Sequence, residues 1–132
     1  MLIRSNRDVS VVLMIEGEQG IKNFVDIIGL DEVDVVFFGP YDLSVSLGIP
    51  GQTDDPRVAD TIRDMIRIAN EHHVKAGMLG INAEDANKWF DYGADYVVAV
   101  GDMALFYRVC NEMIKGVNSS SIGSDCMKLS AS

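Results

Sequence analysis

Two carboxylates stand where a parallel β-sheet would bring side chains together. Glu16 follows the apolar run Val11–Ile15, and Asp42 comes shortly after the next apolar run, Val35–Phe38. Functional groups of parallel α/β folds gather at the carboxyl ends of the strands. Two carboxylates on that rim suit a hard divalent cation such as Mg²⁺ or Mn²⁺, with waters or substrate oxygens as the other ligands. The alternative is that each acid only caps the helix after it.

Other residues with catalytic or ligating chemistry are better explained structurally. Asp102 directly precedes an amphipathic segment and has no polar neighbour, which favours an N-cap over a catalytic role. His72 and His73 are expected at the end of a helix, away from the rim, and adjacent helical residues do not share a face. A metal site built on these two histidines is therefore not expected. Trp89 is interpreted as a core or subunit-interface residue.

Four strand-then-helix units position these groups. Strands are predicted near residues 11–16, 34–39, 75–80 and 95–101. Asp55 before Pro56, and Asn82, have the residue types that begin helices. The helices are predicted from apolar residues at helical spacing: Ile21, Phe24, Val25 and Ile28; Val58, Ile62, Met65, Ile66 and Ala69; Ala86 and Phe90; Phe106, Val109, Cys110 and Met113. This alternation predicts a parallel α/β sheet, either open and doubly wound or part of a (β/α)8 barrel.

The segment from Gly39 to Asp55 is predicted to be a long loop. Its stretch Asp42–Gly51 is too long and too apolar for a plain connection, and its Gly and Pro residues suggest a fixed shape that walls a pocket.

Composition excludes several classes of function. A formal charge of −9 argues against nucleic acid as a partner. No G-x-G-x-x-G or P-loop motif occurs, which removes the usual nucleotide sites. Cys110 and Cys126 form no C-x-x-C pair, so a reducing compartment is expected. No apolar run approaches the ~20 residues of a membrane span, and no signal-peptide pattern is visible. The expected location is the cytoplasm, with no membrane contact.

Three stretches of sequence, taken together, are more specific than either acid alone. Met14-Ile15-Glu16, Phe37-Phe38-Gly39-Pro40-Tyr41-Asp42-Leu43-Ser44 and Ser46-Leu47-Gly48-Ile49-Pro50-Gly51-Gln52 resemble the HpcH/HpaI aldolase family, which comprises class II pyruvate aldolases of the 4-hydroxy-2-oxoheptanedioate and 2-keto-3-deoxy acid type. The resemblance runs from about Ile3 to Gly116. It implies a half-barrel domain over residues 1–116. The stretch 117–132 is Ser-rich and aperiodic, and this composition predicts a flexible tail.

The resemblance implies a site and a reaction. Glu16 and Asp42 would hold Mg²⁺ or Mn²⁺, with Co²⁺ also possible, and Gly39, Pro40 and Tyr41 would line the pocket for pyruvate or another 2-oxo acid. The metal would stabilise the enolate that attacks an aldehyde, or that retro-cleavage releases. Met14 departs from the pattern, since several members have Gln at this position.

The second departure concerns the barrel itself. The family's barrel is about twice as long, in line with the ~250 residues of the fold. By resemblance, the acid–base His and the carboxylate-binding Arg belong to its first four strands, so no catalytic residue is expected in this half. The chain is expected to begin in the helix before the fifth strand. Its aldolase activity is expected to be impaired; the alternative is a non-catalytic half-barrel used for assembly or binding. Open strand edges predict a homo-oligomer.

Overall fold

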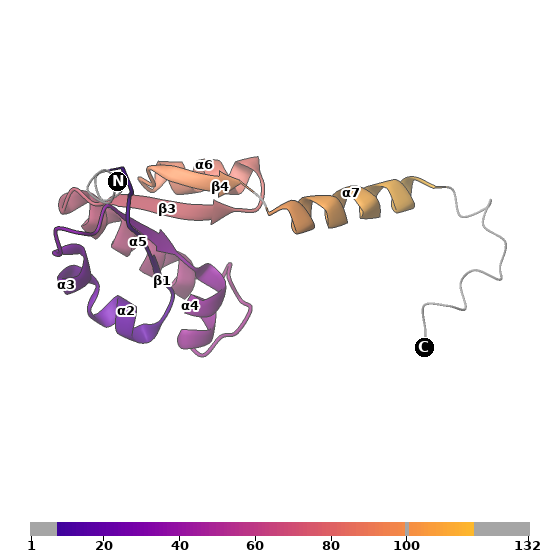
Figure 1. Cartoon of the computed structure of the whole chain (residues 1–132). Helices are drawn as coiled ribbons and strands as arrows, with labels where there is room; N and C mark the ends of the chain where they lie inside the picture. The colour runs from indigo at the N-terminus through magenta and orange to yellow at the C-terminus, as the bar shows by residue number, and fades with distance from the viewer. Residues whose placement is uncertain (1–7, 100, 118–132) are drawn as a thin grey trace. The chain divides into compact units, whose positions relative to one another are not determined.

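The computed structural model describes residues 8–99 and 101–117, which belong to two compact units, Met1–Ala99 and Val100–Ser132. The first unit contains a four-stranded parallel sheet whose spatial order follows the chain (Figure 1). Its strands are β1 (Val12–Ile15), β2 (Val35–Phe38), β3 (Lys75–Gly80) and β4 (Tyr96–Ala99). The prediction of four parallel strands, each followed by a helix, is confirmed.

The helices of this unit fill the connections between strands. They are α2 (Glu18–Lys22), α3 (Phe24–Ile28), α4 (Pro40–Ser46), α5 (Pro56–Glu71) and α6 (Ala83–Asp91). Two predicted helix starts are confirmed by capping hydrogen bonds: Asp55 accepts from the backbone N–H of Arg57, and Asn82 accepts from that of Asp85. The predicted apolar stripe of α5 is also confirmed, because all five of its residues are buried.

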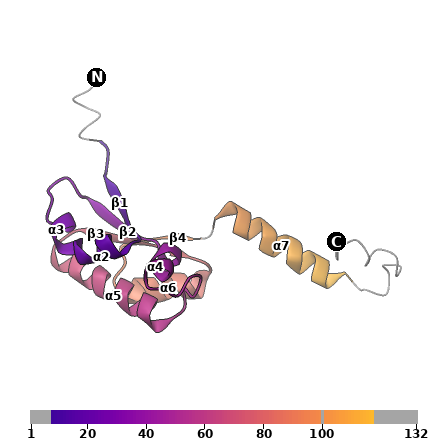
Figure 2. The same cartoon turned by 90° about the horizontal axis from the view of Figure 1, so that it is seen from below.

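One face of the sheet is covered by helices and the other is open. Residues of alternate positions, such as Val36, Phe38, Ala76 and Met78, are fully buried in the core, and the helices of this unit lie together on that side of the strands (Figure 2). The opposite positions are exposed or half-buried, apart from Gly77, which is buried. Their exposed apolar members are Val12, Met14, Leu79 and Val98.

The open face has one aromatic contact that partly covers it. Met14, Phe37, Gly77 and Tyr96 pair in a row across all four strands. The centroids of the Phe37 and Tyr96 rings lie 5.9 Å apart, and Tyr96 leans over Gly77 so closely that a Cβ on Gly77 would collide with its ring. Burial raises the pKa of the Tyr96 hydroxyl.

Three details of the sequence prediction are wrong. The helix expected over residues 21–28 is broken at Asn23 into α2 and α3, and Val25 is exposed. Asn is a poor helix former because its amide competes for backbone hydrogen bonds. The expected loop from Gly39 to Asp55 contains helix α4. On α6 it is Trp89 that is buried, as interpreted from the sequence, whereas Phe90 is 48% exposed.

The second unit is described over residues 101–117 and consists of α7 (Asp102–Gly116). Its N-cap is Gly101, so the predicted Asp102 cap is wrong by one position; the Asp102 carboxylate accepts from the neighbouring N–H of Met103. Within this unit by itself, a single helix offers the predicted stripe no packing partner, and Phe106, Val109 and Met113 are exposed. The predicted Ser-rich tail, with Cys126, lies outside the described residues beyond Val117.

Among the helices described here, none is long and apolar enough to cross a membrane.

Candidate functional site

Glu16 lies directly beside Gly39 at the carboxyl ends of the first two strands. The β1–β2 pairing ends with Ile15 opposite Phe38, and the N–H of Gly39 donates to the carbonyl of Ile15 at 3.2 Å. A Cβ placed on Gly39 would stand 3.0 Å from the Glu16 Cβ and 3.2 Å from its Oε2. The same point is 3.8 Å from the sulfur of Met14. Glycine therefore leaves the space that the Glu16 carboxylate occupies.

Asp42 lies in the first turn of α4, three residues after Gly39. Gly39 is the N-cap of this helix and Pro40 occupies its first turn, where a missing N–H costs nothing. A carboxylate in the first turn is favoured by the helix dipole. The structure thus places Asp42 just past the end of β2, on the same rim as Glu16.

Neither acid serves as a helix cap. The N-cap before α2 is Gly17 and the one before α4 is Gly39, and neither helix has a side-chain capping bond. Within residues 8–99 and 101–117, no ion pair or hydrogen bond engages the carboxylate of Glu16 or Asp42; the Ser46 hydroxyl donates to the backbone carbonyl of Glu16. The alternative that they only cap is therefore wrong.

Several other acids of the unit are engaged structurally. The Asp55 carboxylate accepts two hydrogen bonds from the Arg57 side chain and one from its N–H, which lowers the pKa of Asp55 to about 2. Burial opposes ionisation of Asp95, but hydrogen bonds from Lys75 and from the N–H of Ala76 outweigh it and hold the pKa of Asp95 below its usual value. Glu16 and Asp42 differ in being exposed and unengaged.

The donor set at the rim matches a hard cation in part. Carboxylate oxygens are the preferred ligands of Mg²⁺ and Mn²⁺. The part of the chain that the structure describes contains no group of three or more His, Cys, Asp or Glu residues that could hold a metal. A metal at Glu16 and Asp42 would therefore depend on water or substrate oxygens for most of its ligands, as a catalytic ion with open positions does.

Ser44 fixes the shape of the segment that follows Gly39. Its fully buried hydroxyl donates to the carbonyl of Tyr41 at 2.5 Å and accepts from the N–H of Gly51 at 2.9 Å. Gly48 and Gly51 have φ of +74° and +77°, which side-chain-bearing residues rarely adopt. The expected fixed shape of this segment is confirmed, and it is Ser44, not singled out from the sequence, that links its two ends.

A pocket of about 160 Å³ opens beside this segment. Of the predicted substrate-binding residues, Pro40 and Tyr41 line it; Gly39 does not, and neither metal-ligand candidate does. The remaining lining residues come from the loop before α5, the end of β3 and helix α6: Thr53, Asp54, Leu79, Ile81, Asp85, Lys88 and Trp89. The expectation that the 39–55 segment walls a pocket is thus confirmed. Lys88 was missed because helical spacing alone does not mark a pocket wall.

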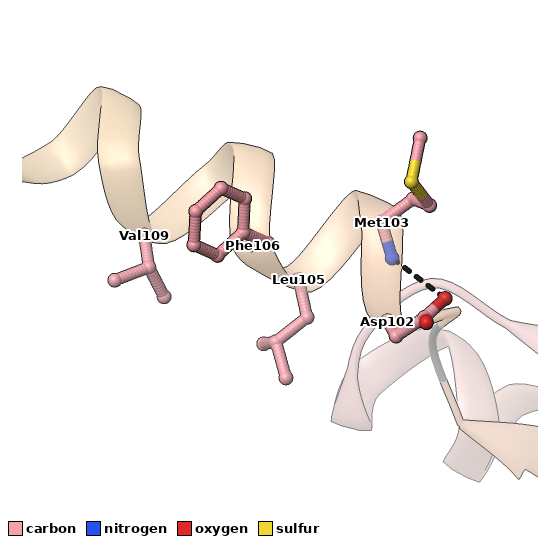
Figure 3. Close-up of a pocket in the computed structure, with 5 residues that line it drawn as sticks. All are labelled: Asp102, Met103, Leu105, Phe106 and Val109. Carbon is pink, nitrogen blue, oxygen red and sulfur yellow. Dashed lines mark hydrogen bonds between the residues drawn. The ribbon is translucent and has the colours of Figure 1, made fainter.

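Two other features are not part of this site. His72 and His73 follow α5 and precede β3, which places them at the amino ends of the strands, opposite the rim, as expected. In the second unit, a hollow of about 550 Å³ is lined by Asp102, Met103, Leu105, Phe106 and Val109 (Figure 3). All five belong to α7, so this hollow is formed by a single helix.

Comparison with known proteins gives the family. Residues 2–107 match the family model HpcH/HpaI aldolase/citrate lyase. A 5-keto-4-deoxy-D-glucarate aldolase from Escherichia coli is 32% identical over 103 residues, which are 78% of this chain and 40% of that protein. An enzyme of the same description from Klebsiella pneumoniae is also 32% identical over 103 residues, again 40% of its length. The chain thus spans well under half the length of these relatives.

Solved structures agree with this result. An HpcH/HpaI aldolase from Desulfitobacterium hafniense has a TM-score of 0.79 and 27% identity, and the match covers 89% of this chain and 47% of that one. A family protein from Burkholderia cenocepacia, 23% identical with a TM-score of 0.79, covers 86% and 44% and shows the fold alone. The prediction that the four βα units correspond to half of a (β/α)8 barrel is confirmed. The chain belongs to the HpcH/HpaI aldolase/citrate lyase family.

Proposed function

We propose that this chain carries the metal-binding and 2-oxo-acid-binding part of a class II pyruvate aldolase. The reaction is a carbon–carbon lyase step that cleaves or forms a 4-hydroxy-2-oxo acid, with pyruvate and an aldehyde as the other partners. The observation that carries the proposal is the contact of Glu16 with Gly39, which sets one unengaged carboxylate on the rim that Asp42 shares. Because the matched relatives are aldolases, a carbon–carbon lyase is favoured over a non-catalytic assembly or binding module.

Glu16 and Asp42 would hold Mg²⁺ or Mn²⁺, with Co²⁺ as a further possibility. When bound, the ion would supply Lewis-acid stabilisation of the charge that develops as the 2-oxo acid loses a methyl proton. The chain's own contribution is positional. Gly39 leaves room for Glu16, and the Ser44 hydrogen bonds hold the Tyr41 carbonyl and therefore the Pro40–Tyr41 wall. Preorganisation of this kind limits the reorganisation needed during the reaction.

The proton-transfer group is not part of the described rim. Both histidines lie at the opposite edge of the sheet, so neither reaches the ends of β1 and β2 where Glu16 and Asp42 lie. A positioned acid–base group contributes typically ~10²–10⁴ in rate. Low turnover by this chain alone is therefore part of the proposal, as are a homo-oligomeric state and a cytoplasmic location.

The experiment is an assay of pyruvate release from a 4-hydroxy-2-oxo acid with added Mn²⁺. Slow turnover is expected, lost with chelator and in both Glu16→Gln and Asp42→Asn. Glu84→Gln, at an exposed acid in the first turn of α6, is the matched control and should retain the rate. Turnover that survives both rim substitutions would contradict the proposal.

A further inference from the structure

The sulfur of Met14 and the carboxylate of Glu16 lie around one point, the place where a Cβ on Gly39 would stand. That point is 3.2 Å from Oε2 of Glu16 and 3.8 Å from Sδ of Met14. The sulfur and the carboxylate oxygen are therefore no farther apart than the sum of these two distances. Met14 belongs to β1 and Glu16 follows directly after it, and residues two apart along a strand project to the same side of the sheet.

The core does not enclose the thioether of Met14. Among the methionines that the structure describes in the first unit, Met65 and Met78 are buried in the core, whereas Met14 is 57% exposed. A methionine side chain has three rotatable bonds and a polarisable sulfur. Met14 can therefore turn its sulfur toward the Glu16 carboxylate without disturbing a buried contact.

The Glu16 carboxylate is equally accessible. Glu16 is exposed, and no ion pair or hydrogen bond in the described part of the chain engages its carboxylate. Leaving aside the chain neighbours of Gly39, the three heavy atoms nearest to the Cβ point are the Cβ and Oε2 of Glu16 and the Sδ of Met14. This corner of the rim thus combines one oxygen donor with one sulfur donor.

An oxygen donor beside a thioether changes which ion a site prefers. Carboxylate and water oxygens suit Mg²⁺ and Mn²⁺, whereas thioether sulfur favours softer ions. For a given set of ligands, affinity already rises from Mn²⁺ to Co²⁺, and a neighbouring sulfur widens that difference. The effect is largest where the protein supplies few of the ligands, because each additional donor is then a large share of the whole set.

We propose that Met14 determines the ion specificity of the rim: its thioether, beside the Glu16 carboxylate, favours an ion of borderline or soft character, such as Co²⁺, over Mg²⁺ and Mn²⁺. This inference rests on the proposed function, because it requires an ion at Glu16. It deepens that proposal by giving a role in ion selection to a residue that otherwise belongs only to the apolar open face of the sheet.

The test compares a soft probe ion, Cd²⁺, with Mn²⁺ by isothermal titration of the full chain. All proteins carry Cys110→Ser and Cys126→Ser, so that no thiol competes for the soft ion. Met14→Leu keeps the volume and the apolar surface and removes only the sulfur. It is expected to weaken Cd²⁺ binding about fivefold, the effect of one lost donor, and to leave the Mn²⁺ affinity within about twofold.

Two further measurements sharpen the comparison. Met14→Gln offers an amide oxygen in place of the sulfur and should bind Mn²⁺ more tightly and Cd²⁺ more weakly than the parent. Cadmium NMR reads the donor directly, since a sulfur ligand moves the resonance to higher frequency than oxygen ligands alone; Met14→Leu should move it back to lower frequency. Met103→Leu, at a methionine of α7 that is 82% exposed, is the matched control and should change neither affinity nor resonance.

Unchanged Cd²⁺ affinity or an unchanged cadmium resonance in Met14→Leu would overturn the inference. Glu16→Gln in the same background separates it from the proposed function. If Mn²⁺ binding requires Glu16 but Cd²⁺ binding is indifferent to Met14→Leu, the metal site stands and the role of Met14 is refuted. If Cd²⁺ binding requires both Glu16 and Met14 while Mn²⁺ does not bind, the ion of the proposed function is contradicted and the soft-ion preference stands. Binding of neither ion contradicts both.

Discussion

The Glu16 side chain fills the space that a side chain on Gly39 would need. The distance from a Cβ on Gly39 to the Glu16 Cβ would be 3.0 Å, which is tighter than nearly all real contacts of this kind. The Glu16 Cβ is fixed to the strand end, so it cannot rotate away. Glycine is therefore needed at this position to leave room for the Glu16 side chain. The Gly39 backbone does not itself require glycine, because its φ of −99° is accessible to any residue.

Gly39→Ala should weaken Mn²⁺ binding several-fold while the protein still folds. The new methyl group would push Glu16 by a few tenths of an ångström, and metal sites are sensitive to displacements of that size. Isothermal titration with Mn²⁺ measures the change. Gly17→Ala is the matched control, because a Cβ there would meet only the Ser46 hydroxyl, at 3.9 Å. Equal losses in both variants would show that Gly39 has no special relation to the site.

Ser44→Ala should lower the free energy of unfolding by about 1–3 kcal/mol, because it leaves the Gly51 N–H without its acceptor. Urea denaturation measures the loss. Ser46→Ala is the control: its exposed hydroxyl makes one long hydrogen bond of 3.4 Å, to the Glu16 carbonyl, and the change should stay within about 0.5 kcal/mol. A Ser44 variant as stable as the Ser46 variant would refute the bridging role.

Asp95 should make stability depend on acid pH. Its folded-state pKa lies below the unfolded value of about 3.9, so its contribution is present above that pH and is lost as pH falls toward the folded pKa. Wild type should lose stability below about pH 4 more steeply than Asp95→Asn, as measured by thermal melts across pH. Asp64→Asn, an exposed acid on α5, should melt like wild type. Parallel curves for wild type and Asp95→Asn would contradict this assignment.

Self-association is expected because β1 and β4 are the outer strands and the open face exposes Val12, Met14, Leu79 and Val98. Sedimentation at micromolar concentration should show a dimer. Met14→Glu should shift it toward monomer, whereas Val25→Glu, on an exposed position of α3, should not. A clean monomer with a cooperative melt would refute this prediction.

The sequence predicts the fold where local signals agree with tertiary packing. Asp55 before Pro56 marks a helix start with two residue types that suit it, and the stripe of α5 is buried as its spacing indicates. The break at Asn23 and the exposure of Phe90 are harder to foresee. They depend on which neighbours each helix meets, and periodicity allows either Trp89 or Phe90 to face inward on a helix as short as α6.

For the site, the sequence predicts which acids share a rim but not what surrounds them. Strand order and the end of each strand place Glu16 and Asp42 at neighbouring strand ends. The closeness of Glu16 to Gly39 and the Ser44 bridge come from contacts between separate elements. No local pattern encodes these contacts.

Titration of Mn²⁺ into the wild type, Glu16→Ala and Asp42→Ala tests the central claim most directly. Weak binding by the wild type is expected, because two protein carboxylates supply few of the ligands that an octahedral ion needs. Each rim variant should lose most of that affinity, while Glu84→Ala, at an exposed acid in the first turn of α6, should keep it. Equal binding by the wild type and both rim variants would contradict the metal site and, with it, the proposed chemistry.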